Sequence, residues 1–424
     1  MDLDPIGEPA LESPPPEHVP HVYVPLSVPN IGATERAYVD ECLRTGWVST
    51  AGPFVERFER EFAGALGVGH AVTTASGTAA LHTALLLAGV RPEDEVVVPS
   101  LTFIAPANAV RYVGAWPTFV DVDQDYWQLD PHELRAFLRD DCTASGGQLR
   151  NRHTGRRVVA VLPVDILGHP CDLPALKEIA EQYGLAMIED ATESLGALCG
   201  GRPLGQWSRL TCFSFNGNKV MTTGGGGMLV TDDPDLAQRA RYLTTQAKDD
   251  PVEFVHHEIG YNYRLTSVQA ALGCAQLERL SGFVADKRRI AALYDEAFRD
   301  VPGIQPMKEA PWATASYWMY TILVDPDSCR TDSRSLLQAL AACNIQTRPL
   351  WQPLHLSAAH RGSFARPCPT ASRLNRLALS LPCSTGLTEQ EQRRVIAAVR
   401  HEIMAHRQKS EPPRPAPVTL TPSR

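Results

Sequence analysis

A single lysine, Lys219, stands between an apolar run and a glycine-rich segment in CFSFNGNKVMTTGGGG (212–227). The apolar residues predict a strand that ends in small polar side chains just before the lysine. The four glycines let the backbone turn sharply and approach a bulky planar group. A lysine whose pKa is lowered by partial burial or by a neighbouring cation forms Schiff bases with carbonyl compounds. An exposed loop lysine fits this stretch equally well.

A second segment, VTTASGTAAL (72–81), runs from an apolar strand through Ser76, Gly77 and Thr78 into a helical pattern. The start of a helix offers free backbone N–H groups and the positive end of the helix dipole, and both attract phosphate. Ser214, on the lysine strand, adds a second hydroxyl. The segment therefore predicts a phosphate cup, although a Ser/Thr helix cap with nothing bound is the commoner meaning of the pattern alone.

A third segment, AMIEDATESLGA (186–197), delivers Glu189 and Asp190 to the end of a predicted strand, with Glu193 close behind. A carboxylate there can pair with a protonated pyridine nitrogen, while the simpler alternative is an Asp that caps the next turn. Together the three segments supply an amine, a phosphate cup and an acid for a ring nitrogen. Pyridoxal 5'-phosphate (PLP) requires this set of groups.

The elements around these segments alternate between strands and helices. Apolar runs predict strands at 71–74, 95–98, 118–121, 158–164 and 185–188, and helical spacing predicts helices at 81–88, 104–112 and 173–183. This alternation predicts an α/β fold with a mostly parallel central sheet flanked by helices. Open sheets of this kind bind ligands at the carboxyl ends of their strands, where the three segments would meet. The polar stretch 140–157 is expected to be a surface excursion.

The chain is long enough for two domains between Pro-rich tails. We expect disordered tails at 1–22 and 408–424, a large PLP-binding domain at 23–275, and a smaller C-terminal α+β domain at 276–407.

The composition excludes several classes of protein. Lys and Arg number 40 against 48 Asp and Glu, a formal net charge of −8, so no broad basic surface is available for nucleic acid or an anionic membrane. No apolar stretch has the length of a bilayer span and no secretory signal opens the chain, which predicts a cytoplasmic protein. Ten cysteines without C-x-x-C spacing argue against a zinc or other metal site and against a disulfide framework.

In its ordered motifs the chain resembles the DegT/DnrJ/EryC1/StrS family of sugar aminotransferases, which are fold-type-I PLP enzymes. The likeness runs from about Val24 to His401. The motifs are SGTAAL, PSLTFIAPANAVRYVGAWPTFVDVD, LGHPCDLPAL, IEDATESLGA, FSFNGNKVMTTGGGGM, EIGYNYRLTSVQAALG and TRPLWQPLH. The resemblance implies the PLP-dependent transferase fold of type I with its smaller C-terminal domain.

The resemblance also assigns roles to matching positions. Lys219 matches the lysine that forms the Schiff base and carries the proton, and Asp190 matches the partner of the pyridine nitrogen. Glu193 stands where relatives contact the phenolic oxygen of the cofactor. Phe103 matches the aromatic residue that stacks on the cofactor ring, although a core position is an equally ordinary place for it.

Other positions match the phosphate site and the substrate wall. Gly77, Thr78 and Ser214 match the phosphate cup. Asn262 resembles an asparagine that reaches the phosphate from the neighbouring subunit, which implies a homodimer with shared active sites; a local cap is the alternative. Substrate contact and plain packing remain equally open for the polar and aromatic residues of TRPLWQPLH, which are Arg348, Trp351 and His355.

The implied reaction moves an amino group from L-glutamate to C4 of a nucleotide-linked 4-keto-6-deoxy sugar. EDATESLGA, NGNK, TTGGGG and LTTQAKDDP resemble the branch that acts on UDP-2-acetamido-4-keto-2,6-dideoxyhexose, on routes to bacillosamine- or legionaminic-acid-type sugars. GDP-4-keto-6-deoxymannose, the precursor of perosamine, is the alternative substrate. Relatives usually read PVHILGHP, whereas Asp165 here puts an anion in place of a cation near the expected site.

Two further classes of protein compete with this interpretation. Related PLP-dependent sugar dehydratases carry His in place of the lysine, and Lys219 argues against that class. A non-catalytic PLP-binding regulatory protein is the other alternative, and the complete set of lysine, carboxylate and phosphate-cup residues favours an enzyme over it.

Overall fold

The computed structural model describes residues 23–250 and 252–410, with side chains through Arg407. The tail expected at 1–22 lies outside the described residues, as do 411–424. Residues 408–410, which we expected in the C-terminal tail, continue the last helix, α13 (Glu389–Ser410).

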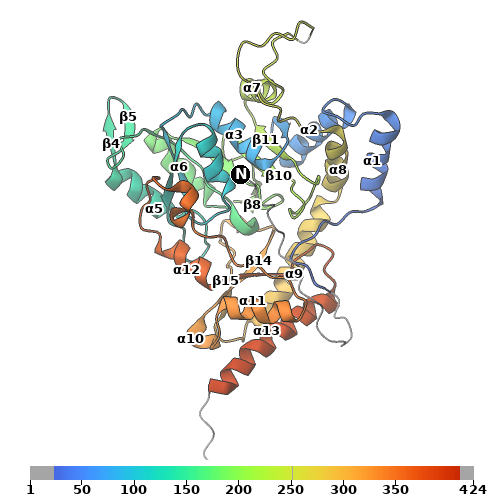
Figure 1. The fold of residues 1–424 in the computed structure, drawn as a ribbon, viewed down its shortest axis with the longest axis vertical. Helices are drawn as coiled ribbons and strands as arrows, with labels where there is room; N and C mark the ends of the chain where they lie inside the picture. The colour runs from blue at the N-terminus through green and yellow to red at the C-terminus, as the bar shows by residue number, and fades with distance from the viewer. Residues whose placement is uncertain (1–22, 251, 411–424) are drawn as a thin grey trace, which may run out of the picture.

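A seven-stranded sheet forms the centre of the upper part of the molecule (Figure 1). Its strand order is β1 (His70–Thr74), β11 (Gly227–Thr231), β10 (Leu210–Ser214), β7 (Ala186–Asp190), β6 (Val158–Val161), β2 (Glu95–Pro99) and β3 (Trp116–Val120). Neighbouring strands from β10 to β3 are parallel, and only β11 runs antiparallel to its two neighbours. The mostly parallel α/β fold is therefore confirmed.

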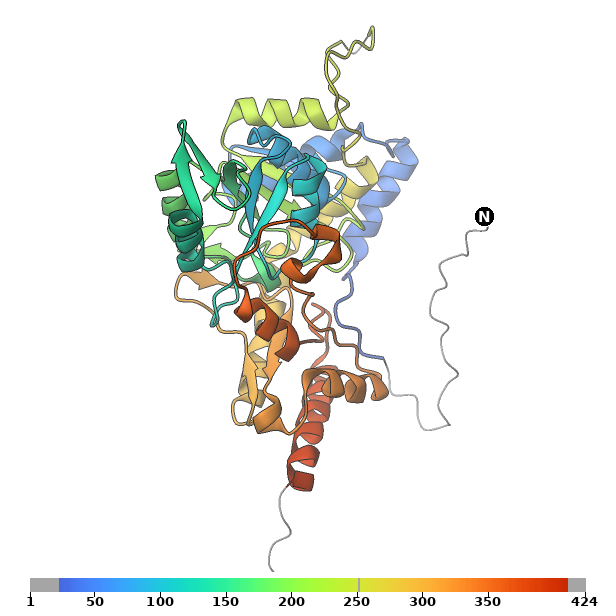
Figure 2. The same ribbon diagram turned by 60° about the vertical axis from the view of Figure 1, so that its left-hand side comes forward.

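Helices pack around this sheet (Figures 1 and 2). They are α1 (Ala33–Thr45), α2 (Pro53–Leu66), α3 (Gly77–Leu87), α4 (Ala105–Tyr112), α5 (Pro131–Ala136), α6 (Leu173–Tyr183), α7 (Pro234–Thr244) and α8 (Ser267–Glu278). Side-chain caps begin several of them. Ser76 Oγ accepts from Ala79 N at 3.1 Å at the start of α3, and Asp172 does the same for Ala175 in α6.

A second, antiparallel sheet lies in the lower part of the molecule (Figure 1). Its strands are β12 (Ile304–Pro306), β14 (Tyr320–Val324) and β15 (Ala378–Leu381), and the helices of this part are α9 (Leu280–Phe298), α10 (Pro326–Cys329), α11 (Ser333–Ala342), α12 (Pro369–Leu377) and α13. The domain boundary predicted after residue 275 falls inside α8, and the division itself remains a prediction.

Short contacts tie the two parts of the chain together. A small sheet joins β8 (Leu198–Cys199) to both β9 (Arg202–Pro203) and β13 (Ala313–Thr314). Near the N-terminus, Val24 N donates to Asn344 O at 2.9 Å and Val28 N donates to Ser384 Oγ at 3.0 Å. The first described residues therefore pack on the C-terminal part, although we placed them in the large domain.

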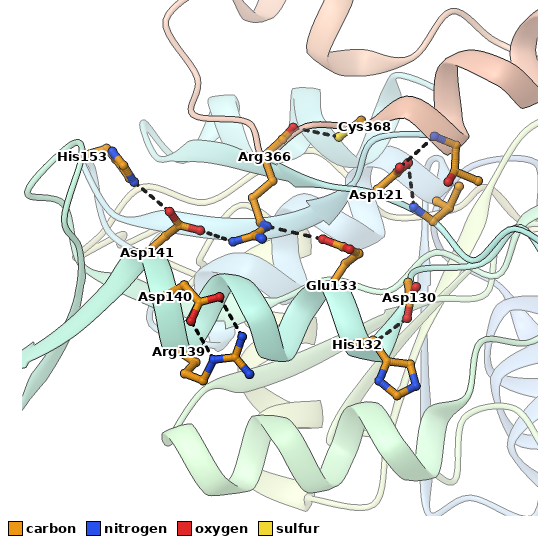
Figure 3. A network of polar contacts seen from close by, with 12 residues as sticks. Asp121, Asp130, His132, Glu133, Arg139, Asp140, Asp141, His153, Arg366 and Cys368 are labelled. Atoms are coloured by element: carbon orange, nitrogen blue, oxygen red, sulfur yellow. Dashed lines mark hydrogen bonds and ion pairs between the residues drawn. The ribbon is translucent and has the colours of Figure 1, made fainter.

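The polar stretch 140–157 forms a mostly exposed hairpin of β4 (Cys142–Ser145) and β5 (Gln148–Asn151) (Figure 1). Arg366, from the segment before α12, forms ion pairs with Asp141 and, at 3.4 Å, with Glu133 (Figure 3). Asp141 also contacts His153 at 2.8 Å. This network anchors the base of the hairpin to the C-terminal part of the chain.

None of the helices in residues 23–250 and 252–410 combines the length and the apolar character that crossing a bilayer demands. All ten cysteines are free thiols, and every one except Cys343 is buried.

Candidate active site

A cavity of about 380 Å³ opens at the carboxyl ends of β7 and β10, beside the start of α3. Most of the residues predicted for the site line it: Gly77, Thr78, Phe103, Asp190, Glu193, Ser214, Lys219 and Trp351. A larger cleft of about 1050 Å³ lies among α9, β12 and α12, and it contains none of the predicted residues. Because the amine and the carboxylates meet in the smaller cavity, we assign the chemistry to it.

Lys219 follows a turn in which its backbone N–H donates to Asn216 O at 3.0 Å. Its side chain is 13% exposed, and Nζ lies 3.7 Å from Glu193 Oε1. Burial lowers the pKa of Lys219 from its ordinary value, while the carboxylates of Glu193 and Asp190 oppose that change. The lysine therefore places an amine of lowered pKa beside acids that can exchange a proton with it.

Asp190 ends β7 and is buried at the wall of the cavity. Parallel pairing sets Asp190 beside Cys212 of β10, two residues before Ser214. Thr192 N donates to Asp190 Oδ1 at 3.0 Å, and burial raises the pKa of Asp190 while Thr192 and Lys219 oppose that shift. A buried carboxylate on a rigid strand is a suitable partner for a cationic ring nitrogen.

Glu193 is fixed at its other carboxylate oxygen. Leu167 N donates to Glu193 Oε2 at 2.9 Å, which leaves Oε1 directed at Lys219. Burial raises the pKa of Glu193 to about 7, and the nearby ammonium of Lys219 opposes the rise. This carboxyl can therefore exchange a proton near neutral pH.

The start of α3 fits a phosphate group. Among the described residues, Ala79 N and Ala80 N make the first hydrogen bonds of the helix, both to Ser76, so the N–H groups of Gly77 and Thr78 remain available at the cavity. A Cβ added at Gly77 would lie 2.8 Å from Ser214 Cβ. Only glycine therefore lets the helix start approach the serine hydroxyl so closely.

Phe103 stands at the cavity with 52% of its surface exposed. This excludes the alternative that Phe103 is a core residue. An exposed aromatic face beside the lysine, the acid and the phosphate cup completes a set of groups that fits PLP.

The other predicted residues lie elsewhere in the chain. Asn262 pairs through its backbone with Thr245 and is not among the residues that line this cavity. Arg348 is exposed and its backbone pairs with Ser380. His355 Nδ1 contacts Ser100 Oγ at 2.5 Å, which engages that ring nitrogen within the fold. Of the predicted substrate wall, the cavity contains Trp351.

Asp165 lies next to the site, as expected, but its side chain does not line the cavity. Asp165 N donates to Asp190 O at 3.0 Å, but its side chain is fully buried and does not reach the cavity in the described structure. Cys171 N donates to Asp165 Oδ1 at 2.7 Å. Burial, and next the charge of Glu189, raise the pKa of Asp165 well above its ordinary value. Burial therefore favours the protonated form of Asp165, and its side chain is a core group outside the wall of the cavity.

Sequence reasoning missed Trp318, which lines the cavity from the C-terminal part of the chain. Its ring centroid lies 4.0 Å from Lys219 Nζ, and Nε1 donates to Asn218 O at 2.6 Å. The surrounding run, SYWMYTILV, has the pattern of a buried strand, and that pattern concealed the one side chain that faces the site.

The model of the DegT/DnrJ/EryC1/StrS aminotransferase family matches residues 29–400. The GDP-perosamine synthase of Caulobacter vibrioides is 36% identical over 89% of this chain and 97% of its own length. The GDP-perosamine synthase of Escherichia coli O157:H7 is 35% identical over 87% of this chain and 95% of its own length.

Solved structures agree in fold. The aminotransferase TlmJ of Streptoalloteichus hindustanus superposes with a TM-score of 0.81 at 30% identity, over 90% of this chain and 99% of TlmJ. DesV of S. venezuelae has a TM-score of 0.78 at 34% identity, over 87% of this chain and 94% of DesV. The chain therefore belongs to the DegT/DnrJ/EryC1/StrS aminotransferase family and is a pyridoxal-phosphate-dependent aminotransferase of nucleotide sugars.

Proposed function

We propose that the protein transfers the amino group of L-glutamate to C4 of GDP-4-keto-6-deoxymannose. The observation that carries the proposal is the similarity to two GDP-perosamine synthases, at 36% and 35% identity over nearly their whole length. The UDP-2-acetamido sugar, which we first expected from local motifs, has no such support and becomes the second candidate.

When bound, PLP carries the amino group between glutamate and the sugar and accepts electrons from the carbon that loses its proton. In the proposed arrangement, the N–H groups of Gly77 and Thr78 and the hydroxyl of Ser214 hold its phosphate. Asp190 keeps a proton on the ring nitrogen, and the exposed ring of Phe103 covers the cofactor ring.

Lys219 is the proposed carrier of the proton in both half-reactions. With the cofactor bound, Lys219 would take the proton from the carbon of glutamate and pass it to the cofactor, and in the second half-reaction it would move a proton from the cofactor to C4 of the sugar. Glu193 Oε1, at 3.7 Å from Nζ, stabilises the ammonium between these steps and is proposed to contact the phenolic oxygen of the cofactor.

A homodimer with shared active sites is part of the proposal. The arm, which we define as residues 246–250 and 252–260, projects from the body of the molecule (Figures 1 and 2). It exposes Val252, Phe254 and Ile259 by 78%, 66% and 82%. Apolar side chains exposed to this degree indicate a surface that a partner covers. Asn262 lies two residues after the end of the arm, where a partner subunit can use it.

We propose that Trp351 contacts the substrate, since it is the residue of the predicted substrate wall that lines the cavity. Arg348 and His355 remain predictions that depend on closure of the two parts of the chain around the substrate.

The test supplies L-glutamate with GDP-, UDP- and dTDP-linked 4-keto-6-deoxy sugars, including the UDP-2-acetamido sugar, and follows amino-sugar formation by mass spectrometry. We expect turnover with GDP-4-keto-6-deoxymannose at a kcat/KM at least tenfold above the others. Preference for a UDP- or dTDP-linked sugar would overturn the substrate assignment. Lys219→Ala should abolish the reaction, whereas Lys177→Ala, at an exposed lysine of α6, should not.

A further inference from the structure

Hydrogen bonds hold both the side chain and the backbone of Trp318. On the side chain, Nε1 donates to Asn218 O at 2.6 Å, and Asn218 is the residue before Lys219. On the backbone, Trp318 O accepts from Lys287 Nζ at 2.9 Å and from Cys383 Sγ at 3.3 Å. The indole itself faces the amine, with 4.0 Å between Lys219 Nζ and the ring centroid.

Lys287, in α9, is a buried lysine that the reaction does not use. It is 2% exposed, and Nζ donates to Cys383 O at 2.6 Å as well as to Trp318 O. Nζ also lies 3.7 Å from Cys383 Sγ, and none of its hydrogen-bond partners among the described residues is a carboxylate. Placing a lysine amine in the core is costly unless it makes hydrogen bonds, so these two carbonyls explain its presence.

The backbone before Trp318 is also constrained. Tyr317 adopts a φ of 50°, a conformation that non-glycine residues seldom take. Ser316 N donates to Gly168 O at 2.8 Å and Met319 N to Leu167 O at 3.3 Å. A Cβ at Gly168 would collide with the backbone of Trp318. Strained backbone of this kind persists where the surrounding structure aims a side chain.

We propose that Trp318 is a positioning residue for Lys219, and that Lys287 acts through Trp318 by fixing its backbone. The indole face lies 4.0 Å from Nζ, Glu193 Oε1 lies 3.7 Å from it, and the charge of Asp190 also acts on it. An ammonium over an indole face is stabilised by the negative charge of the ring surface. Trp318 thereby biases Lys219 toward its charged form and keeps Nζ beside Glu193.

The inference rests on the proposed role of Lys219, yet it can be tested without turnover. In the full-length chain freed of cofactor, lysines are labelled competitively with acetic anhydride across a pH series, and the peptide of Lys219 is quantified by mass spectrometry. The pH midpoint of labelling reports the pKa of Lys219, whereas access to the amine changes only the plateau. Exposed Lys177 serves as the internal reference.

Trp318→Phe and Trp318→Leu form a graded series, since Phe keeps a weaker ring face and Leu keeps only apolar bulk. We expect the pH midpoint of Lys219 labelling to be highest with Trp, lower with Phe and lowest with Leu at position 318. At a fixed pH below the midpoint, the fraction of Lys219 that is neutral should be about threefold to tenfold higher in the Leu variant than in wild type. Trp351→Leu, at the other indole of the cavity, should leave the midpoint unchanged. A midpoint that is unchanged or raised in Trp318→Leu overturns the proposal.

Lys287 is tested by a double-mutant cycle. Lys287→Met should lower the midpoint of Lys219 when Trp318 is present and leave it unchanged in the Trp318→Leu background. Lys287→Arg keeps donors for the two carbonyls and should restore the midpoint; it also serves if the Met variant does not fold. Equal effects of the Met variant in both backgrounds would show that Lys287 does not act through Trp318. The labelling midpoints do not depend on which sugar the protein aminates. A negative result in the sugar assay would therefore overturn the proposed substrate without overturning the role of Trp318.

Discussion

Glu193 lies between Lys219 and the backbone of Leu167, with Oε1 3.7 Å from Lys219 Nζ and Oε2 accepting from Leu167 N at 2.9 Å. One carboxylate therefore joins the reactive amine to the loop after β6. Since Met319 N donates to Leu167 O, the same loop meets the segment that carries Trp318. The amine is thus held between residues from distant parts of the chain.

We predict that Glu193→Gln lowers kcat/KM by about tenfold to a hundredfold, because a hydrogen bond to a charged group contributes roughly 1.5–3 kcal/mol. Burial raises the pKa of Glu193 to about 7, so the wild-type pH profile of kcat/KM should contain an ionisation near neutrality. Initial rates between about pH 5 and 9 should show that this ionisation is absent from the Gln variant. A profile that keeps it would assign the ionisation to another group.

Asp190→Asn should lower kcat by roughly a hundredfold or more, because a neutral amide cannot hold the proton on the cofactor ring nitrogen. Asp165→Asn is the matched control. It alters a buried acid on the adjoining segment whose side chain does not reach the described cavity. Single-turnover kinetics with glutamate should separate the two variants. Comparable losses of kcat in the two variants would show that Asp165 also takes part in the reaction.

The helix start at Gly77 should be intolerant of a side chain. Gly77→Ala puts a Cβ 2.8 Å from Ser214 Cβ, so we expect the dissociation constant for PLP to rise at least tenfold, as measured by fluorescence titration of the cofactor-free protein. Gly64→Ala, in α2, meets nothing within 4 Å. It should leave PLP affinity unchanged and stabilise the protein by about 0.5–1 kcal/mol.

The buried acids should make stability depend on pH. Burial raises the pKa of Glu189 to about 7, and the pKa of Asp165 is raised as well. The folded chain therefore keeps protons that the unfolded chain releases above about pH 4.5. Their stabilising contribution is full below that pH and is lost as pH rises toward 7.

Denaturant unfolding of the cofactor-free protein at several pH values checks this dependence. Between about pH 4.5 and 7, Glu189→Gln should reduce the slope of the free energy of unfolding against pH by up to about 1.4 kcal/mol per pH unit. Arg393→Gln, at an exposed ion pair of α13, should leave the slope unchanged. An equal slope in wild type and in the Glu189 variant would contradict the prediction.

Local sequence was enough to predict the fold class and most of the residues that meet in the candidate cavity. Each of the segments 76–78, 190–193 and 214–219 carries its own signal, which is an apolar strand followed by small or ionisable side chains. In a parallel sheet the carboxyl ends of all strands meet at one edge. Strand-end residues such as Asp190 and Ser214 were therefore bound to converge, even though they are distant in the chain.

Only the tertiary structure decided which side of a segment faces the site. Asp165 and Glu193 are both acids near strand ends, yet one turns into the core and the other toward Lys219. His355 is engaged by Ser100, whereas Trp318 emerges from an apolar run to cover the amine. Such outcomes depend on how the C-terminal part of the chain packs on the large sheet. Side-chain direction there follows from long-range contacts, such as those of Lys287 and Gly168, which leave no periodic pattern in the sequence.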